Sequence, residues 1–354
     1  MVYRITEECA SCGSCETECP NQAISQGTDI FVIDPEKCTE CMGFYDSPHC
    51  VKICPANAPA PDPARRESDD VLLARFKKLH PGLEPKGFVL LQKHDKPVIA
   101  LVADGSGDAE GQAALEELDD FIRGKFPGYD VVWAVQASYM IQGLKYKGQT
   151  TQFKRAVPLI LATDLLKRLA AAGRKKIAMQ LFMSGESNFS KDAIKADKLG
   201  MDIKYGLPFL AAAHPENELK LIKSLEPALG NADTAAVLVG HGSDKDFEYN
   251  EWFINIDKYL RKNYKNSFLG TIHGPPGTDF VASVKASGCK RVRFVSLMMS
   301  RGGHMPLDIL NDKNPKSWSS MVGLPAESVY TFSTNPALRE YFASSIRSLL
   351  AQFK

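Results

Sequence analysis

The residues most able to do chemistry are the cysteines, which crowd the first part of the chain. Eight of the nine lie between Cys9 and Cys54, and Cys289 stands apart. They form two groups of four that each end in Cys-Pro: Cys9, Cys12, Cys15 and Cys19, then Cys38, Cys41, Cys50 and Cys54. Thiolates are soft ligands that suit zinc and iron–sulfur centres. Because nothing in the sequence points to an oxidising compartment, this clustering indicates metal rather than disulfides.

The spacing in the first group favours iron over zinc. Zinc sites usually show two Cys-x2-Cys pairs, whereas here three cysteines at two-residue intervals are followed by a fourth before proline. This run is expected of bacterial [4Fe–4S] ferredoxins, in which the fourth cysteine binds the other cluster. We therefore expect cluster I on Cys9, Cys12, Cys15 and Cys54, and cluster II on Cys38, Cys41, Cys50 and Cys19. Two structural zinc sites remain the alternative.

Residues 1–80 resemble the two-cluster ferredoxins, with an insertion at 42–49. The likeness rests on Cys9-Ala10-Ser11-Cys12-Gly13 and on Cys38-Thr39-Glu40-Cys41-Met42-Gly43-Phe44-Tyr45. We expect the insertion to cover one cluster and so to change its solvent access and potential. The resemblance also implies a helix between 62 and 80, with Ser68 as a candidate cap and Pro81-Gly82 as its stop.

Two histidines follow apolar runs in the second half of the chain. His241 lies in Gly240-His241-Gly242-Ser243 after the run 235–240, and His304 follows the run 291–298. In parallel α/β sheets the carboxyl ends of the strands line the ligand crevice, so both imidazoles should face one cleft. Neutral imidazole binds first-row divalent metals and can accept a proton near neutral pH. We predict both roles for this pair.

The strands that would carry these histidines belong to a weak internal repeat. The segment 98–106 recurs as 235–243, 130–134 as 267–271, and 176–183 as 291–298. Apolar strands that alternate with helical segments predict an α/β domain with parallel sheets. We expect a ferredoxin-like module at 1–82, a linker at 83–95 and a two-lobed domain at 96–354. Its parts should be lobe 1 at about 96–213, lobe 2 at about 233–335 and a final helix at about 336–353, with a ligand cleft between the lobes.

Residues 96–353 are similar to the anaerobic-type sirohydrochlorin cobaltochelatases, lyases of cobalamin biosynthesis that need no ATP. The likeness rests on Gly240-His241-Gly242, Gly302–His304, Asn311-Asp312, Ser317-Trp318 and Asn335-Pro336-Ala337. It implies that His241 and His304 bind metal and accept protons, and that a carboxylate, for which Glu186 is the nearest candidate, follows the strand at 176–183. His273 departs from the acidic family pattern. It could be a third imidazole on the metal, or could signal a different metal or reaction.

The resemblance implies insertion of Co2+, or of Fe2+ or Ni2+, into a metal-free tetrapyrrole. This substrate carries many carboxylates, so Arg301 and Lys145 are candidate anchors, although either could be a solvated surface charge. Metal insertion changes no oxidation state, which leaves the electron module unexplained. One alternative is redox work on a metallotetrapyrrole, by reductive metal removal or ring chemistry; another is a non-catalytic electron carrier with a docking domain. An electron donor or acceptor protein is the expected partner.

The charge balance and the lengths of the apolar runs argue against some other classes of protein. Lys plus Arg is 43 against 42 Asp plus Glu, a net charge of +1, which argues against a nucleic-acid binder. No apolar run approaches the roughly twenty residues of a membrane span, and the first cysteine group follows Met1 too closely for a signal peptide. We expect a cytoplasmic protein and leave its homo-oligomeric state open. The other histidines should be structural or solvated: His49, His80, His94 and His214.

Overall fold

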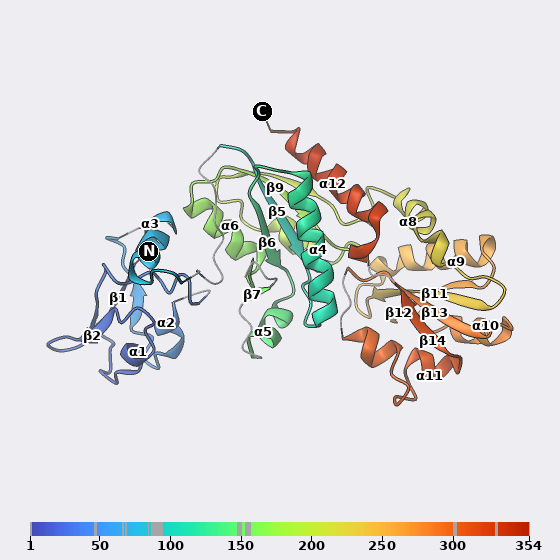
Figure 1. The fold of residues 1–354 in the computed structure, drawn as a ribbon, viewed down its shortest axis with the longest axis horizontal. Helices are drawn as coiled ribbons and strands as arrows, with labels where there is room; N and C mark the ends of the chain where they lie inside the picture. The colour runs from blue at the N-terminus through green and yellow to red at the C-terminus, as the bar shows by residue number, and fades with distance from the viewer. Residues whose placement is uncertain are drawn as a thin grey trace.

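The computed structural model describes residues 2–45, 48–65, 67, 69–83, 85, 95–146, 151–152, 157–299, 303–329 and 332–353. Figure 1 shows three parts in chain order: a small N-terminal module in blue, a first α/β lobe in green, and a second lobe in yellow to red. Among the described residues, no helix has both the length and the apolar character needed to cross a bilayer.

The N-terminal module is built from short elements around its cysteines. Strand β1 (Tyr3–Ile5) pairs antiparallel with β4 (Pro59–Pro61), and β2 (Ile24–Gln26) pairs antiparallel with β3 (Phe31–Ile33). Helices α1 (Ser14–Thr17) and α2 (His49–Ile53) carry cysteines of the two groups, and α3 (Asp69–Leu79) follows. The expected helix is therefore present and stops before Pro81, while Ser68 lies outside the described residues.

The insertion in the second cysteine group is fixed to helix α3. Met42 and Phe44 pack with Leu72 and Phe76 in one buried cluster, and the Phe44 and Phe76 ring centroids are 5.3 Å apart. Gly43 lies between them at φ +85°, where an added Cβ would come within 2.3 Å of the Phe76 ring. Only glycine fits this close approach without displacing the aromatic ring.

Each of the two following lobes contains a four-stranded parallel sheet. Lobe 1 has the order β10-β9-β5-β6, from β5 (Val98–Ala103), β6 (Val131–Val135), β9 (Lys176–Leu181) and β10 (Asp202–Gly206). Lobe 2 has the order β12-β11-β13-β14, from β11 (Thr234–Gly242), β12 (Ser267–His273), β13 (Arg291–Ser296) and β14 (Ala326–Val329). The two orders are the same, with β5 equivalent to β11. The predicted α/β class with parallel sheets is confirmed.

Helices connect the strands in both lobes. Lobe 1 contains α4 (Ala109–Lys125), α5 (Ser138–Tyr146), α6 (Ala162–Ala171) and α7 (Asn188–Lys195), and a two-residue hairpin pair, β7 (Thr151–Gln152) and β8 (Val157–Pro158). The later helices are α8 (Asn217–Leu225), α9 (Glu251–Asn263), α10 (Phe280–Ala286), α11 (Trp318–Val322) and α12 (Pro336–Leu350). Short helical turns are η1 (Glu226–Ala228), η2 (Phe247–Asn250), η4 (Phe332–Thr334) and the π-helical η3 (Met305–Ile309).

The last helix follows lobe 2 in the chain but packs against lobe 1. Asn335 caps α12 by accepting backbone N–H groups from Ala337 and Leu338. Phe342 is buried, and its ring centroid lies 4.3 Å from that of Phe182, just beyond β9. Figure 1 shows α12, in red, running beside α4 of lobe 1. One apolar core therefore runs through both lobes and supports the strands that lead to the candidate site.

We expect Phe342→Ala to lower the free energy of unfolding by about 3–5 kcal/mol, because it empties a buried ring site shared by the lobes. Phe247 is 61% exposed, so Phe247→Ala is the matched control and should change stability by less than about 0.5 kcal/mol. Denaturant titration of both variants measures the difference, and equal losses would show that α12 does not hold the lobes together.

Candidate metal centres

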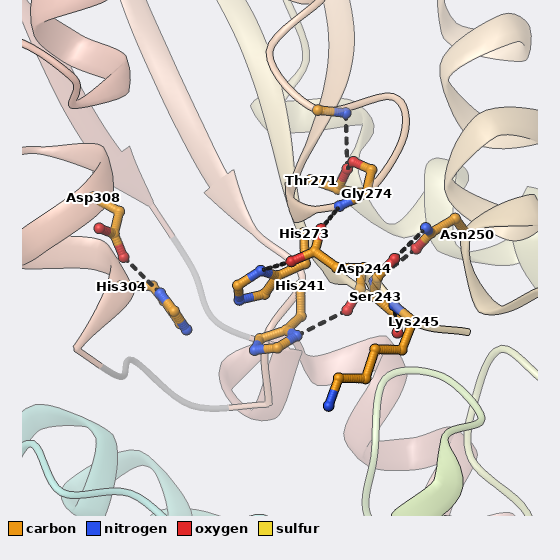
Figure 2. Close-up of polar contacts among 12 residues, drawn as sticks. His241, Ser243, Asp244, Lys245, Asn250, Thr271, His273, Gly274, His304 and Asp308 are labelled. Carbon is orange, nitrogen blue, oxygen red and sulfur yellow. Dashed lines mark hydrogen bonds and ion pairs between the residues drawn. The ribbon is translucent and has the colours of Figure 1, made fainter. Parts of the chain in front are cut away.

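Three imidazoles converge at the carboxyl edge of the lobe 2 sheet. His241 lies near the end of β11, His273 ends β12, and His304 directly precedes the π-helix η3 after β13 (Figure 2). Their ring centroids are separated by 5.1, 5.2 and 5.9 Å. One ring nitrogen from each lies within 4.8 Å of the others, which is close enough to hold a single metal ion.

Each imidazole is oriented by a hydrogen bond at Nδ1. The Nδ1 of His304 lies 2.6 Å from Asp308 Oδ2, and that of His273 lies 2.8 Å from Asp244 Oδ2. The Nδ1 of His241 lies 3.0 Å from the Gly242 carbonyl oxygen. All three partners are acceptors, so the assigned tautomer carries its proton on Nδ1. The lone pair on each Nε2 is then free for a metal, as in metal sites whose ligands have carboxylate or carbonyl partners.

The local sequence allows the strands that carry these rings to approach closely. Gly242 has φ +68°, and a Cβ there would lie 2.0 Å from the His273 carbonyl oxygen. The buried Asn250 side chain accepts the Ser243 N–H at 2.9 Å and donates to the Ser243 carbonyl at 2.8 Å. Asp244 accepts the Gly274 N–H at 2.7 Å, so one carboxylate links both loops. These contacts fix the loops that carry His241 and His273 relative to each other.

The packing of the rings disfavours the protonated form of His241. Partial loss of hydration lowers the pKa of His241 most, although the residue is still exposed to solvent. The charges of His304 and His273, when these rings are protonated, lower it further. A depressed pKa keeps His241 neutral, and therefore able to bind metal, to lower pH than an ordinary histidine.

The other residues predicted from the sequence lie elsewhere. Glu186 follows β9 in lobe 1, where its carboxylate accepts the Ala212 N–H at 3.3 Å; among the described residues it is not part of the metal-capable group. Lys145 lies in α5, with its side chain outside the description, and Arg301 is outside the described residues. Asp244 and Asp308 were not predicted, although Asp308 lies four residues after His304 and Asp244 three after His241.

The cysteines line two separate hollows in the N-terminal module. One is lined by Cys9, Cys12, Cys15 and Cys54, and the other by Cys19, Cys38, Cys41 and Cys50. Each hollow thus draws three cysteines from one sequence group and one from the other, a donor set that fits a [4Fe–4S] cluster. Pro48, from the insertion, lines the second hollow.

Two thiols of the second hollow, those of Cys41 and Cys50, are disfavoured as thiolates. Burial, with the nearby thiols, raises the pKa of Cys41 to about 11 and that of Cys50 to about 12. Iron would supply the positive charge that stabilises their thiolates. Backbone N–H groups of His49 and Ala23 already donate to the sulfurs of Cys41 and Cys19, each at 3.3 Å. Such bonds to sulfur tune the potential of a bound cluster.

The remaining histidines have ordinary structural contacts. His49 stacks on Tyr45 with ring centroids 4.3 Å apart, and its Nε2 lies 3.5 Å from Glu18. The Nε2 of His80 lies 2.8 Å from the Asn21 side-chain oxygen, and His214 lies 3.8 Å from Glu216. His94 lies outside the described residues.

Comparison with known families matches both parts of the chain. Residues 98–348 match the family model described as cobalt chelatase (CbiK), and residues 1–55 match the 4Fe-4S dicluster domain. The N-terminal part is 54% identical over 81 residues to ferredoxin Fdx2 of Sorangium cellulosum, covering 80% of that protein and 23% of this chain. It is 46% identical over 81 residues to ferredoxin YfhL of Escherichia coli, covering 94% of that protein.

Two solved structures are similar to the larger part of the chain. SirB from Bacillus subtilis with Fe3+ is 14% identical, with a TM-score of 0.44, and the match covers 72% of this chain and 96% of that one. CbiX, the terminal enzyme for biosynthesis of siroheme in denitrifying bacteria, is 16% identical, with a TM-score of 0.42, and the match covers 73% and 100%.

We expect Asp308→Ala to weaken Co2+ binding about 10–100-fold, because the His304 ring loses the carboxylate that fixes its tautomer and direction. Titration calorimetry with Co2+ alone measures this effect. Asp233→Ala is the matched control, since Asp233 is an exposed carboxylate at the opposite end of β11 and pairs only loosely with Lys290 at 3.5 Å. Equal affinity in the two variants would mean that His304 is not a metal ligand.

We expect Cys54→Ala to damage cluster I, although its neighbours in sequence belong to the second cysteine group. The variant should keep about half of the roughly eight iron atoms expected for two clusters. Iron analysis and electron paramagnetic resonance of protein prepared without oxygen distinguish the clusters. Cys289→Ala, in lobe 2, should leave both unchanged. A lesion limited to cluster II would overturn the crossed ligand set.

Proposed function

Because the chain belongs to the CbiK cobalt chelatase family and begins with a dicluster ferredoxin module, we propose that it inserts a divalent metal ion into a metal-free tetrapyrrole. Co2+ and a sirohydrochlorin-type macrocycle are the proposed substrates, with Fe2+ and Ni2+ as alternative ions. The observation that carries the proposal is the convergence of three imidazoles whose Nδ1 atoms are all engaged. Their Nε2 atoms form a face that can hold one ion and release it.

The ligand set suits transfer rather than permanent storage of the ion. Three neutral nitrogens leave coordination positions open to the pyrrole nitrogens, and imidazole suits first-row divalent metals. A neutral trio also leaves the ion its full double charge, which draws it toward a macrocycle that becomes anionic as it loses protons. Asp244 and Asp308, behind His273 and His304, strengthen these rings as ligands without contacting the ion themselves.

Insertion itself consumes no electrons: M2+ and a macrocycle with two N–H groups give the metallated macrocycle and two protons. The ferredoxin module therefore supports a second candidate function, reductive chemistry on a metallotetrapyrrole in the same cleft. Cys9, Cys12, Cys15 and Cys54 would hold one cluster, and Cys19, Cys38, Cys41 and Cys50 the other. When bound, these clusters supply one-electron transfer to or from a partner protein in the cytoplasm. Arg301 and Lys145 stay candidate anchors for the substrate carboxylates.

Anaerobic incubation with sirohydrochlorin and each metal ion in turn tests the proposal, with the macrocycle spectrum as readout. The double variant His241→Ala, His304→Ala should lose nearly all insertion. His214→Ala should retain it, because His214 is a partly exposed histidine near Glu216 and lies outside the trio. Full insertion by the double variant would overturn the proposal. A reaction that occurs only after the clusters are reduced, and that removes metal or alters the ring, would establish the second candidate instead.

A further inference from the structure

Lobe 1, which contains no histidine, has an aspartate where lobe 2 has His241, at the carboxyl end of its central strand. Because β5 and β11 are the equivalent central strands of two sheets with the same order, their carboxyl ends correspond. The sequence Ala103-Asp104-Gly105-Ser106 at the end of β5 matches Gly240-His241-Gly242-Ser243 at the end of β11. The glycine after each has a positive φ, +85° at Gly105 and +68° at Gly242. Asp104 therefore stands in lobe 1 where His241 stands in lobe 2.

Side-chain contacts join the carboxyl ends of the two sheets. Asn188, which begins α7 after β9, donates to Asp246 Oδ2 at 2.8 Å and accepts from the Tyr249 hydroxyl at 3.2 Å. Lys191 of α7 also pairs with Glu248 at 2.9 Å. Asp246, Glu248 and Tyr249 all follow closely on the His241 loop. The Tyr139 ring, on the lobe 1 side, lies 6.4 Å from Phe189, next to Asn188. The carboxyl end of the lobe 1 sheet is therefore joined to the segment that follows the His241 loop.

Asp104 places an unpartnered oxygen at this edge. Its Oδ1 is buried, and no donor among the described residues reaches it. Gln136, directly after the neighbouring strand β6, also has a buried Oε1 without a described partner, and its N–H binds the Ala103 carbonyl at 2.9 Å. Two acceptors without donors on adjacent strands cost stability unless a ligand supplies the missing donor or cation.

We propose that Asp104 is a further catalytic residue, a base on lobe 1 that accepts a pyrrole N–H proton from the macrocycle face opposite the histidine trio. This inference rests on the proposed function. Gln136 Oε1, beside it, would accept a hydrogen bond from the macrocycle and orient it. Metal delivery and proton removal then use different residues on opposite faces of the macrocycle. This separation is needed because an Nε2 lone pair bound to metal cannot accept a proton at the same time.

The step balances without an oxidant or reductant. The Asp104 carboxylate takes one N–H proton, and the electron pair left on nitrogen forms a bond to the ion arriving from the histidine side. As the ion leaves an Nε2, that nitrogen takes the second proton. Both protons then pass to water, and the metal keeps its oxidation state.

The electrostatics of Asp104 suit this role. Burial raises its pKa to about 6, close to the pH at which a base both stays ionised and binds a proton well. Partial burial, and then the negative charge of Asp104, raise the pKa of Tyr139, which shows that the two groups lie near each other. Tyr139 is itself 59% exposed and could relay the proton outward.

Asp104→Asn tests the inference, because it keeps the shape and removes the base. At saturating Co2+, the insertion rate should fall at least about 100-fold, while Co2+ affinity and tetrapyrrole affinity change less than about twofold. Acetate or formate should partly restore an Asp104→Ala variant, as expected for a lost base. Asp192→Asn, an exposed carboxylate in the same lobe, is the control. Insertion by Asp104→Asn at the wild-type rate, or a loss of Co2+ affinity, would overturn the assignment.

A second measurement separates this inference from the proposed function. The folded-state pKa of Asp104, about 6, lies above the ordinary value of 3.8, so wild-type stability falls as pH rises through that window. Asp104→Asn should therefore melt at a higher temperature than wild type at about pH 8 and at the same temperature at about pH 4. A lower melting point at both values would make Asp104 structural and overturn the inference, whether or not insertion is observed. No insertion by wild type with any ion would overturn the proposed function alone.

Discussion

The candidate site depends on how closely the ends of β11 and β12 approach each other. At Gly242 the backbone leaves no room for a Cβ beside the His273 carbonyl. Asn250 and Asp244 hold the two loops by hydrogen bonds to backbone groups. A larger residue at position 242 would push the strands apart and separate the His241 and His273 rings, which now lie 5.1 Å apart. The geometry of the site thus depends on this close backbone approach and on the two side chains that hold the loops together.

Close approach of three imidazoles has an electrostatic consequence. Burial lowers the pKa of His241 most, and the neighbouring imidazoles, when charged, lower it further, so this ring favours its neutral form. The carboxylates on His273 and His304 then stabilise a metal-loaded site, whose charge is positive, more than an empty one. The same contacts that orient the rings therefore favour loading with a divalent cation.

Part of the candidate sites could be predicted from local sequence patterns. Cysteine spacing predicted two sets of four, and strand ends predicted that His241 and His304 would meet. Their hydrogen-bond partners were not predicted, because Asp244 and Asp308 are ordinary loop and helix carboxylates until the fold orients them. Glu186 was placed by likeness to a family, but its strand belongs to the other lobe, where it accepts the Ala212 N–H. The repeat aligned Asp104 with His241, yet only the packing revealed a buried oxygen that no donor in the described part of the chain reaches.

Two lobes of one topology have thus acquired complementary chemistry at equivalent strand ends. Lobe 2 offers nitrogen lone pairs that suit a transition-metal ion, and lobe 1 offers buried oxygens that lack donors among the described residues. Metal insertion requires the ion to arrive and the protons to leave, and one lone pair cannot serve both at once. A planar macrocycle between the lobes would present its nitrogens to both edges. The apolar core that both lobes share, with α12 packed against Phe182, joins the elements that carry these two sets of groups.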